Sequence, residues 1–428
     1  MSKLVIFGKN VVASATKVVA NVFIEIHRGK ICRLTHFGKD PDIVADVVLP
    51  GFIDPHVHCR DWKESRKETL KTAAQAALHG GVTQIHDMPN TDPPILTEDD
   101  IKKRLETFEK SRIPVRYMLY AGLTAQRSQI REVVRAEKKY MDVAGLKLYA
   151  GESVGELGVT DPEKQLGIYK DLADLKYTGV LMVHCEKESE LLKKTWSVNN
   201  PETWCDIRPP NAEIESVRDQ LNFAIKTGFR GHLHFCHITL PESLEMIKIA
   251  PKTLRVSAGV TPHHLLLGYE SMKKKSRGLY YKVNPPLRMR EKAAGLAAHL
   301  LAGRVECIET DHAPHLVREK LNAPYASGMP ELDTFSNFVS LLNTQLRIPF
   351  GDIAKLTSLN AANIFGLGLR GIEHRNEADL TLIDMRPEVI KRGNMKTKCG
   401  WSPYEGMTFP GRCKAVVISG NIAYLEKS

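Results

Sequence analysis

The chain has 428 residues, 43% of them hydrophobic and 26% charged, and its formal net charge is +10. This composition is ordinary for a globular protein, and no apolar stretch approaches the length of a membrane span. The basic residues are dispersed apart from Lys273-Lys274-Lys275, which argues against a nucleic-acid groove. The N-terminus does not resemble a signal peptide, and the eight cysteines include no Cys-x-x-Cys pair. We therefore expect a cytoplasmic protein that binds neither nucleic acid nor membrane.

The two ends of the chain share one pattern. Short apolar runs separated by polar residues and glycine turns fill residues 1–48 and return in residues 376–428. Such runs predict β-hairpins. We expect the two segments to pack together as a small β-sandwich beside a larger domain formed by residues 49–375.

The middle of the chain alternates between short apolar runs and helix-like stretches. The strand-like runs are residues 50–58, 82–90, 115–121, 143–150, 180–186, 232–238, 254–261 and 305–312. The helix-like segments include residues 68–78, 99–110, 131–141, 163–175, 214–226 and 290–301. Strands rich in Val, Ile and Leu that alternate with helices indicate parallel βαβ units. Eight such units predict an α/β fold, a (β/α)8 barrel of the TIM type, with its active site where the strands end.

The first of these runs ends in His56-Val57-His58. On a strand the side chains alternate, so His56 and His58 project to the same face. Imidazole is the commonest protein ligand for zinc-like metals. The pair alone is equally compatible with two histidines that make ordinary hydrogen bonds at a strand end.

Other strand ends carry further candidate ligands, namely Lys147, His184, His237 and Asp311. A lysine inside an apolar run is costly to bury as an ammonium. Carbon dioxide can convert it to a carbamate that bridges two metal ions, whereas the alternative is a lysine that reaches solvent. Four separate strand ends that supply such groups to one barrel mouth predict a metal site.

The number of ligands suffices for two metal ions. His56, His58 and Asp311 would surround one ion, His184 and His237 the other, and carboxylated Lys147 would lie between them. Water between two cations is acidified toward neutrality and becomes a hydroxide nucleophile. Asp311 would then take and return the proton as general base and acid.

This ligand pattern resembles the amidohydrolase superfamily over essentially the whole chain, and within it the long, type I dihydroorotases. His56-Val57-His58-Cys59-Arg60 is similar to a family motif whose arginine binds the substrate carboxylate, and Asp87-Met88-Pro89-Asn90-Thr91 to one whose asparagine contacts the same carboxylate. Asn284, in Val283-Asn284-Pro285-Pro286, matches a contact to the pyrimidine ring. His315, four residues after Asp311, matches a further substrate contact.

The resemblance implies reversible cyclisation of N-carbamoyl-L-aspartate to L-dihydroorotate in pyrimidine synthesis. It also implies two Zn²⁺ ions per subunit bridged by carboxylated Lys147, a homodimer, and association with aspartate transcarbamoylase. The substrate contacts expected on this basis are Arg60, Asn90, Asn284, His315 and Gly328.

Some residues depart from the family pattern. Glu331 stands where family members usually have a second glycine after Gly328, which puts backbone contacts to the pyrimidine in doubt. Residues 152–155, after the fourth strand, lack an obvious match to the family's substrate-closing threonine. Asn90 and Asn284 could instead form turns beside proline.

Cys59, Cys185 and Cys236 each lie beside a proposed functional residue, and we expect all three thiols to face away from the metals. Two alternative functions stay open. One is a hydantoinase- or allantoinase-like cyclic amidohydrolase, which would share the metal ligands but generally lack Arg60 and Asn90. The other is a non-catalytic scaffold relative.

Overall fold

The computed structural model describes residues 3–152, 157–194, 196–274, 277–368 and 371–426. Eight parallel strands pair in chain order, each with the next. They are β5 (Phe52–Val57), β6 (Val82–Asp87), β7 (Arg116–Gly122), β8 (Val143–Ala150), β9 (Val180–Cys185), β10 (His232–Phe235), β11 (Arg255–Val260) and β12 (Cys307–Ile308). The gap between the first and last strands is bridged where the His58 amide donates to the His312 carbonyl at 2.8 Å. The predicted barrel is therefore confirmed.

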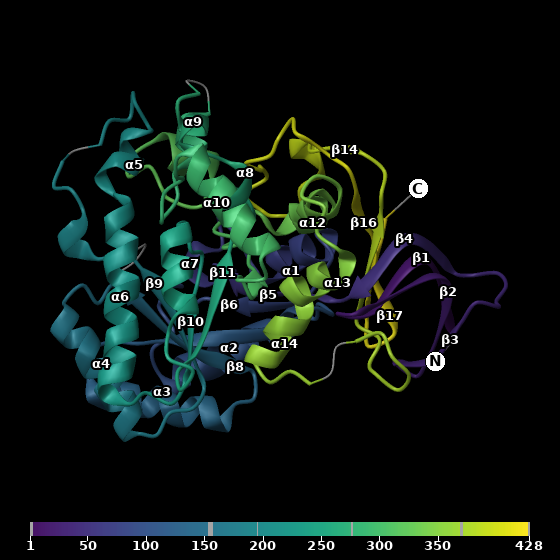
Figure 1. The fold of residues 1–428 in the computed structure, drawn as a ribbon, viewed down its shortest axis with the longest axis horizontal. Coiled ribbons are helices and arrows are strands. Elements are labelled where there is room, and N and C mark those ends of the chain that lie inside the picture. The colour runs from purple at the N-terminus through teal and green to yellow at the C-terminus, as the bar shows by residue number, and fades with distance from the viewer. Residues whose placement is uncertain (1–2, 153–156, 195, 275–276, 369–370, 427–428) are drawn as a thin grey trace.

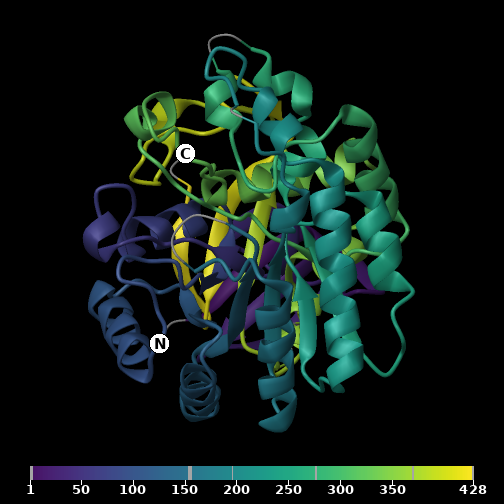
Figure 2. The same ribbon diagram turned by 90° about the vertical axis from the view of Figure 1, so that its left-hand side faces the viewer.

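Helices stand around the strands, as Figures 1 and 2 show. Those that follow the first seven strands are α1 (Leu70–His79), α2 (Glu98–Ser111), α3 (Arg127–Lys139), α4 (Pro162–Asp174), α6 (Pro210–Thr227), α7 (Pro241–Lys248) and α10 (Arg290–Leu301). Their starts follow local sequence, since Thr69 and Thr97 cap α1 and α2 with their side chains. In the described ranges, no helix combines the length and apolar character that a membrane crossing requires.

Further helices lie in the connections that follow β9, β11 and β12. They are α5 (Thr203–Ile207), α8 (Pro262–Leu266), α9 (Tyr269–Met272), α11 (Val317–Leu321), α12 (Phe335–Thr344), α13 (Phe350–Ala354) and α14 (Asn360–Ile364). Helix α11 begins two residues after His315 and so holds a predicted substrate contact close to the strand ends.

The two ends of the chain form one seven-stranded sheet, whose purple and yellow strands lie together in Figure 1. In spatial order its strands are β17 (Asn421–Leu425), β16 (Arg412–Ile418), β13 (Leu380–Asp384), β4 (Ile43–Pro50), β1 (Leu4–Ser14), β2 (Lys17–His27) and β3 (Lys30–Thr35). A further small pair joins β14 (Glu388–Val389) to β15 (Thr408–Phe409).

The terminal sheet curls around its own apolar core. Gly29, in the turn between β2 and β3, lies against Ser419 and Gly420, in the turn between β16 and β17. Ile24 of β2 and Val417 of β16 belong to the same buried cluster. The expected joint packing of the two chain ends is thus observed, in a single curled sheet rather than in two separately hydrogen-bonded ones.

The segment between β14 and β15 crosses the barrel mouth. The Trp401 indole donates to the carbonyl of His315 at 2.8 Å, and the Tyr404 hydroxyl donates to Glu331 at 2.7 Å. Trp401 and Tyr404 are both buried in a cluster that also contains Val283. The C-terminal part of the chain therefore helps to fix the loops above the strand ends.

Candidate metal centre and substrate pocket

A cavity opens at the carboxyl ends of the barrel strands, and we call it the mouth cavity. It collects nearly all the residues that the sequence singled out, although they are spread over more than 270 positions of the chain. The residues that line it are His56, His58, Arg60, Asn90, Tyr149, His184, His237, Val283, Asn284, Asp311, Ala313, Ser327 and Gly328. Of the predicted site residues, Lys147 and His315 lie beside this lining rather than in it.

The first donor group is built by His56, His58 and Asp311. The Nε2 atoms of His56 and His58 lie 3.3 and 3.0 Å from the same oxygen, Oδ1 of Asp311. All three residues are buried. On its other side, His58 Nδ1 lies 2.6 Å from Oδ1 of Asn90. Because that oxygen only accepts, His58 carries its proton on Nδ1 and leaves Nε2 free as a ligand atom.

The second donor group joins His184 and His237, whose Nδ1 and Nε2 atoms are 3.1 Å apart. His184 Nε2 contacts the Glu186 carboxylate at 3.1 Å, which again fixes the tautomer and turns Nδ1 toward the cavity. Arg208 holds Glu186 through two hydrogen bonds of 3.0 and 2.6 Å. Burial favours the protonated carboxyl, but the Arg208 charge outweighs it and lowers the pKa of Glu186 to about 2.

Burial favours the neutral form of three histidines in the cavity, His56, His184 and His237. Burial lowers the pKa values of His56 and His237 well below the usual range, and it also lowers that of His184. A neutral imidazole keeps a lone pair available for a metal ion. Buried Nδ1 atoms of His56 and His237 have no hydrogen-bond partner among the described residues. These neutral rings and the Asp311 carboxylate therefore form a donor set that suits a cation.

Lys147, on β8, is completely buried beneath these histidines. Its Nζ lies 2.9 Å from Sγ of Cys236 and 5.1 Å from the centre of the Tyr149 ring. The alternative of a lysine that reaches solvent is therefore wrong. An ammonium in this position contacts a thiol and a ring face and makes no hydrogen bond to a carboxylate of the described residues, so conversion to a carbamate would relieve a poorly compensated charge.

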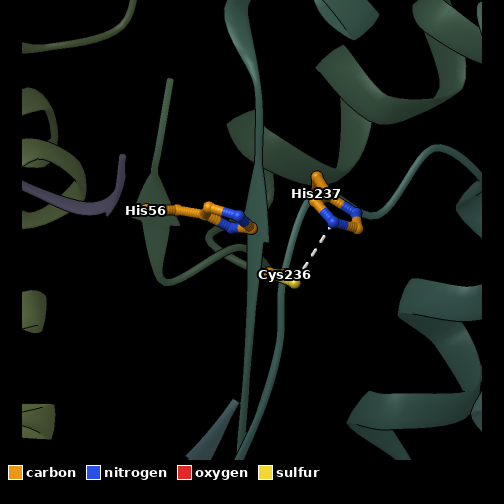
Figure 3. A group of neighbouring side chains, drawn as sticks. All are labelled: His56, Cys236 and His237. Atoms are coloured by element: carbon orange, nitrogen blue, oxygen red, sulfur yellow. Dashed lines mark hydrogen bonds between the residues drawn. The ribbon is translucent and has the colours of Figure 1, made fainter. Parts of the chain in front are cut away.

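Cys236 corrects one expectation, because its thiol faces the site. Sγ lies 3.3 Å from Nε2 of His237, and the two residues form a donor group with His56 (Figure 3). Strand alternation would place neighbours 236 and 237 on opposite faces. His237 instead has a φ of 40°, in the left-handed region, which turns its ring toward the same mouth. The expectation holds for Cys59 and Cys185, which belong to the main apolar core.

Glu309 has no predicted role, yet it lies against three histidines, His56, His234 and His237. Glu309 is fully buried. Its Oε1 accepts from the His237 amide, and its Oε2 lies 3.3 Å from Nε2 of His234. Oε1 is 3.9 Å from His56 Nδ1. The signal was available, since Glu309 stands two residues before Asp311 and so shares its face of the strand end.

Arg60 and His315 lie side by side at one end of the cavity. Nη2 of Arg60 donates to Nε2 of His315 at 3.2 Å. The Arg60 side chain is only 2% exposed, yet its Nε and Nη1 have no hydrogen-bond partner in the described part of the chain. Burial lowers the pKa of His315 well below its usual range, so this ring is neutral and accepts from the guanidinium.

Asn284 and Gly328 also line the cavity, and Gly328 lies beside His315, because a Cβ on this glycine would be 3.2 Å from the His315 ring. The Trp204 indole donates to Oδ1 of Asn284 at 3.1 Å, which leaves the amide nitrogen to face elsewhere. Gly328 has a φ of 136°, and a Cβ there would lie 2.7 Å from the Ala313 carbonyl oxygen. A side chain at position 328 would therefore be strained, while the role of Gly328 as a substrate contact stays a prediction.

Glu331, which replaces a family glycine, does not line the cavity. Its carboxylate accepts from Tyr404 at 2.7 Å and lies 3.1 Å from Nδ1 of His263. The contact also shows where His263 lies, a residue to which the sequence assigned no role. Residues 153–155 of the loop after β8, where a closing threonine was sought, lie outside the described residues.

Comparison with known proteins gives a consistent set of relatives. The model of the amidohydrolase family matches residues 47–163. The dihydroorotase of Pyrococcus furiosus is 33% identical over 414 residues, which cover 94% of this chain and 89% of that protein. The dihydroorotase of Pyrococcus abyssi is 35% identical over 383 residues, with coverage of 88% and 83%.

Solved structures share the fold. The L-hydantoinase of Arthrobacter aurescens superposes with a TM-score of 0.85 at 20% identity and covers 99% of this chain and 96% of its own. The D-hydantoinase of a Thermus species gives a TM-score of 0.83 at 22% identity, with coverage of 99% and 95%. At this identity the likeness shows a common architecture of barrel and terminal sheet and does not extend to the substrate.

Proposed function

The chain belongs to the dihydroorotase family of the amidohydrolases, and on that premise we propose that it interconverts N-carbamoyl-L-aspartate and L-dihydroorotate in pyrimidine synthesis. The observation that carries this proposal is the buried Arg60 beside the metal donors. Its Nε and Nη1 atoms are buried and make no hydrogen bond to the described residues, although Nη1 lies 3.9 Å from the Glu64 carboxylate, and Arg60 lines the cavity. A guanidinium in that state is suited to a carboxylate, which both substrates carry.

The donor groups fit two divalent ions, which we propose are Zn²⁺. His56, His58 and Asp311 would hold one and His184 and His237 the other, with Lys147 as a carbamate between them. Such ions would acidify water and polarise the amide carbonyl. Cys236 stands close enough to contribute a thiol, although burial raises its pKa to about 12 and so disfavours the thiolate.

The residues of the chain divide the remaining work. Arg60, Asn90 and His315 would orient the carboxylate, and the free amide nitrogen of Asn284 would donate to a ring carbonyl. In hydrolysis, water adds to the ring carbonyl carbon and Asp311 takes its proton. The carbon–nitrogen bond then breaks as Asp311 passes the proton to the ring nitrogen. In the synthetic direction the carbamoyl nitrogen attacks the side-chain carboxyl, and water leaves.

The second candidate is a hydantoinase-like activity, because two solved structures that share this fold are hydantoinases. Hydantoins lack the exocyclic carboxylate of dihydroorotate, so such a substrate would offer no carboxylate to the buried donors of Arg60 that make no hydrogen bond to the described residues. Every predicted metal ligand is also present and buried, which argues against a non-catalytic scaffold.

One assay separates the three functions. Purified protein is supplied with N-carbamoyl-L-aspartate, dihydroorotate is followed by ultraviolet absorbance, and the metal content of the same sample is measured. We expect turnover with about two metal ions per chain. Two ions without turnover, but with hydantoin hydrolysis, would favour the second candidate. A folded, metal-supplemented protein with neither metal nor turnover would favour a scaffold.

Lys147→Ala tests the carbamate. This variant should lose tight metal binding and activity together, because the bridging anion would be missing. Near wild-type turnover would refute the bridging role, and bicarbonate-dependent recovery of metal binding in decarboxylated wild-type protein is the matched positive control.

We also propose a cytoplasmic homodimer that associates with aspartate transcarbamoylase. Its eight cysteines are all free thiols in the structure, which suits a reducing compartment. Size-exclusion chromatography with light scattering, with and without that enzyme, tests the assembly.

A further inference from the structure

Lys320 is a second buried lysine, outside the metal centre and fully enclosed. It lies on α11, five residues after His315. Its Nζ donates to three backbone carbonyls, those of Lys282 at 2.8 Å, Ala326 at 2.8 Å and Gly328 at 2.9 Å. The acceptors come from two segments about 40 residues apart in the chain.

Both segments form walls of the mouth cavity. Lys282 directly precedes Val283 and Asn284, which line the cavity. Ala326 directly precedes Ser327 and Gly328, which line it as well. The segments also contact each other, since the Gly328 amide donates to the Lys282 carbonyl at 2.9 Å. The Lys282 carbonyl therefore receives two hydrogen bonds, and Lys320 joins three points around it.

The three acceptors match the three N–H donors of an ammonium, whereas a neutral amine has only two. Burial and the nearby Lys282 charge oppose the ammonium by lowering the pKa of Lys320 well below its usual range, and the three carbonyls favour it. A buried cation that contacts carbonyls instead of a carboxylate is costly for stability alone. Its tetrahedral donors do, however, fix the relative positions of three carbonyls, which an apolar side chain of the same length could not.

We propose that Lys320 is a positioning residue that clamps the Asn284 and Gly328 walls against each other and so sets the width of the substrate pocket. The inference rests on the proposed function, because Asn284 and Gly328 are its predicted ring contacts. Lys320 itself touches no substrate. Its position on α11 also ties both walls to His315, whose carbonyl accepts from Trp401 at 2.8 Å.

Lys320→Met is the direct test, since methionine has a similar length and no donor. We expect KM for L-dihydroorotate to rise roughly tenfold or more while kcat changes less than about threefold, because the walls would lose their spacing but the metal centre would not. Lys320→Gln keeps two N–H donors on a shorter side chain and should give an intermediate KM.

The matched control is Tyr177→Phe. The buried Tyr177 hydroxyl also donates to a backbone carbonyl, that of Val180 at 2.8 Å, but at the opposite end of the barrel. This variant should lose thermal stability without a change in KM. If Lys320→Met behaves in the same way, with KM within twofold of wild type, the positioning role is wrong.

Hydrogen exchange of the unliganded protein gives a readout that does not depend on activity. Peptides that cover residues 281–285 and 325–329 should exchange slowly in wild type and about tenfold faster in Lys320→Met. If neither variant folds, hydrogen exchange of the wild-type protein still tests the proposal. Exchange of residues 325–329 as fast as in an exposed loop would refute the clamp. Absence of dihydroorotate turnover in wild type would instead refute the proposed function and leave the exchange result standing.

Discussion

At the scale of single residues, Arg60 has more hydrogen-bonding capacity than the protein uses. Its Nη2 contacts His315, while Nε and Nη1 are buried and make no hydrogen bond to the described residues, with Glu64 3.9 Å from Nη1. Unsatisfied buried donors cost free energy in the unliganded protein. A bound carboxylate would satisfy them, so the ligand would complete a network that folding leaves open.

Arg60→Ala should therefore raise KM by about 2–4 kcal/mol, or roughly 30- to 1,000-fold, because a desolvated charge pair is lost. Arg60→Lys keeps the charge without the two-pronged geometry and should fall between this variant and wild type. Steady-state kinetics with L-dihydroorotate measures both. An unchanged KM in Arg60→Ala would show that the carboxylate binds elsewhere.

Glu186 predicts a dependence of stability on pH. Its pKa is about 2 in the folded protein and near 4.5 when unfolded, so the unfolded chain binds more protons between these values. The ion pair with Arg208 then stabilises the fold fully above about pH 4.5 and loses roughly 3 kcal/mol as pH falls to about 2.

Urea unfolding over this pH range checks the prediction. Glu186→Gln should lose this part of the acid dependence, whereas Glu373→Gln, at an exposed position, should keep it. Identical pH profiles for wild type and Glu186→Gln would contradict the assignment.

At the scale of elements, the barrel was predictable because each strand is a short apolar run that ends in polar residues. Helix α12 was not predicted, because the polar residues on one of its faces are small and uncharged and residues 335–342 are all buried, so it lacks the charged surface that marks the outer barrel helices. The placement of His56 and His58 in one donor group followed from strand alternation. Cys236 did not, because the left-handed backbone at His237 breaks that alternation, and one sequence does not reveal such a φ.

Two glycines in different elements should respond oppositely to alanine. Gly167 is exposed within α4, where an added Cβ meets no atom within 4 Å, so Gly167→Ala should stabilise the protein by about 0.5–1 kcal/mol. Gly328→Ala should destabilise it and raise KM, because φ is 136° and the Cβ approaches Ala313. Chemical unfolding and kinetics test the pair, and equal effects would contradict this reading of the two backbones.

At the scale of the whole molecule, barrel and terminal sheet share one apolar core. The main cluster combines Val47 and Leu49 of β4 and Val416 of β16 with residues of the barrel strands. We expect a single cooperative unfolding transition, with equal calorimetric and van 't Hoff enthalpies. Two resolved transitions in calorimetry would show that the parts unfold independently.

The order of the terminal sheet has a consequence for synthesis on the ribosome. Strand β4 lies between β1 and β13, and β13 begins about 330 residues after β4 ends. At a synthesis rate of roughly 5–20 residues per second, β13 is made on the order of 15–65 s after β4. During that interval the nascent chain exposes an unpaired strand, the kind of surface that chaperones bind and that aggregates form on. Yield in the cell should thus depend on chaperone supply and translation speed more than the stability of the finished protein suggests.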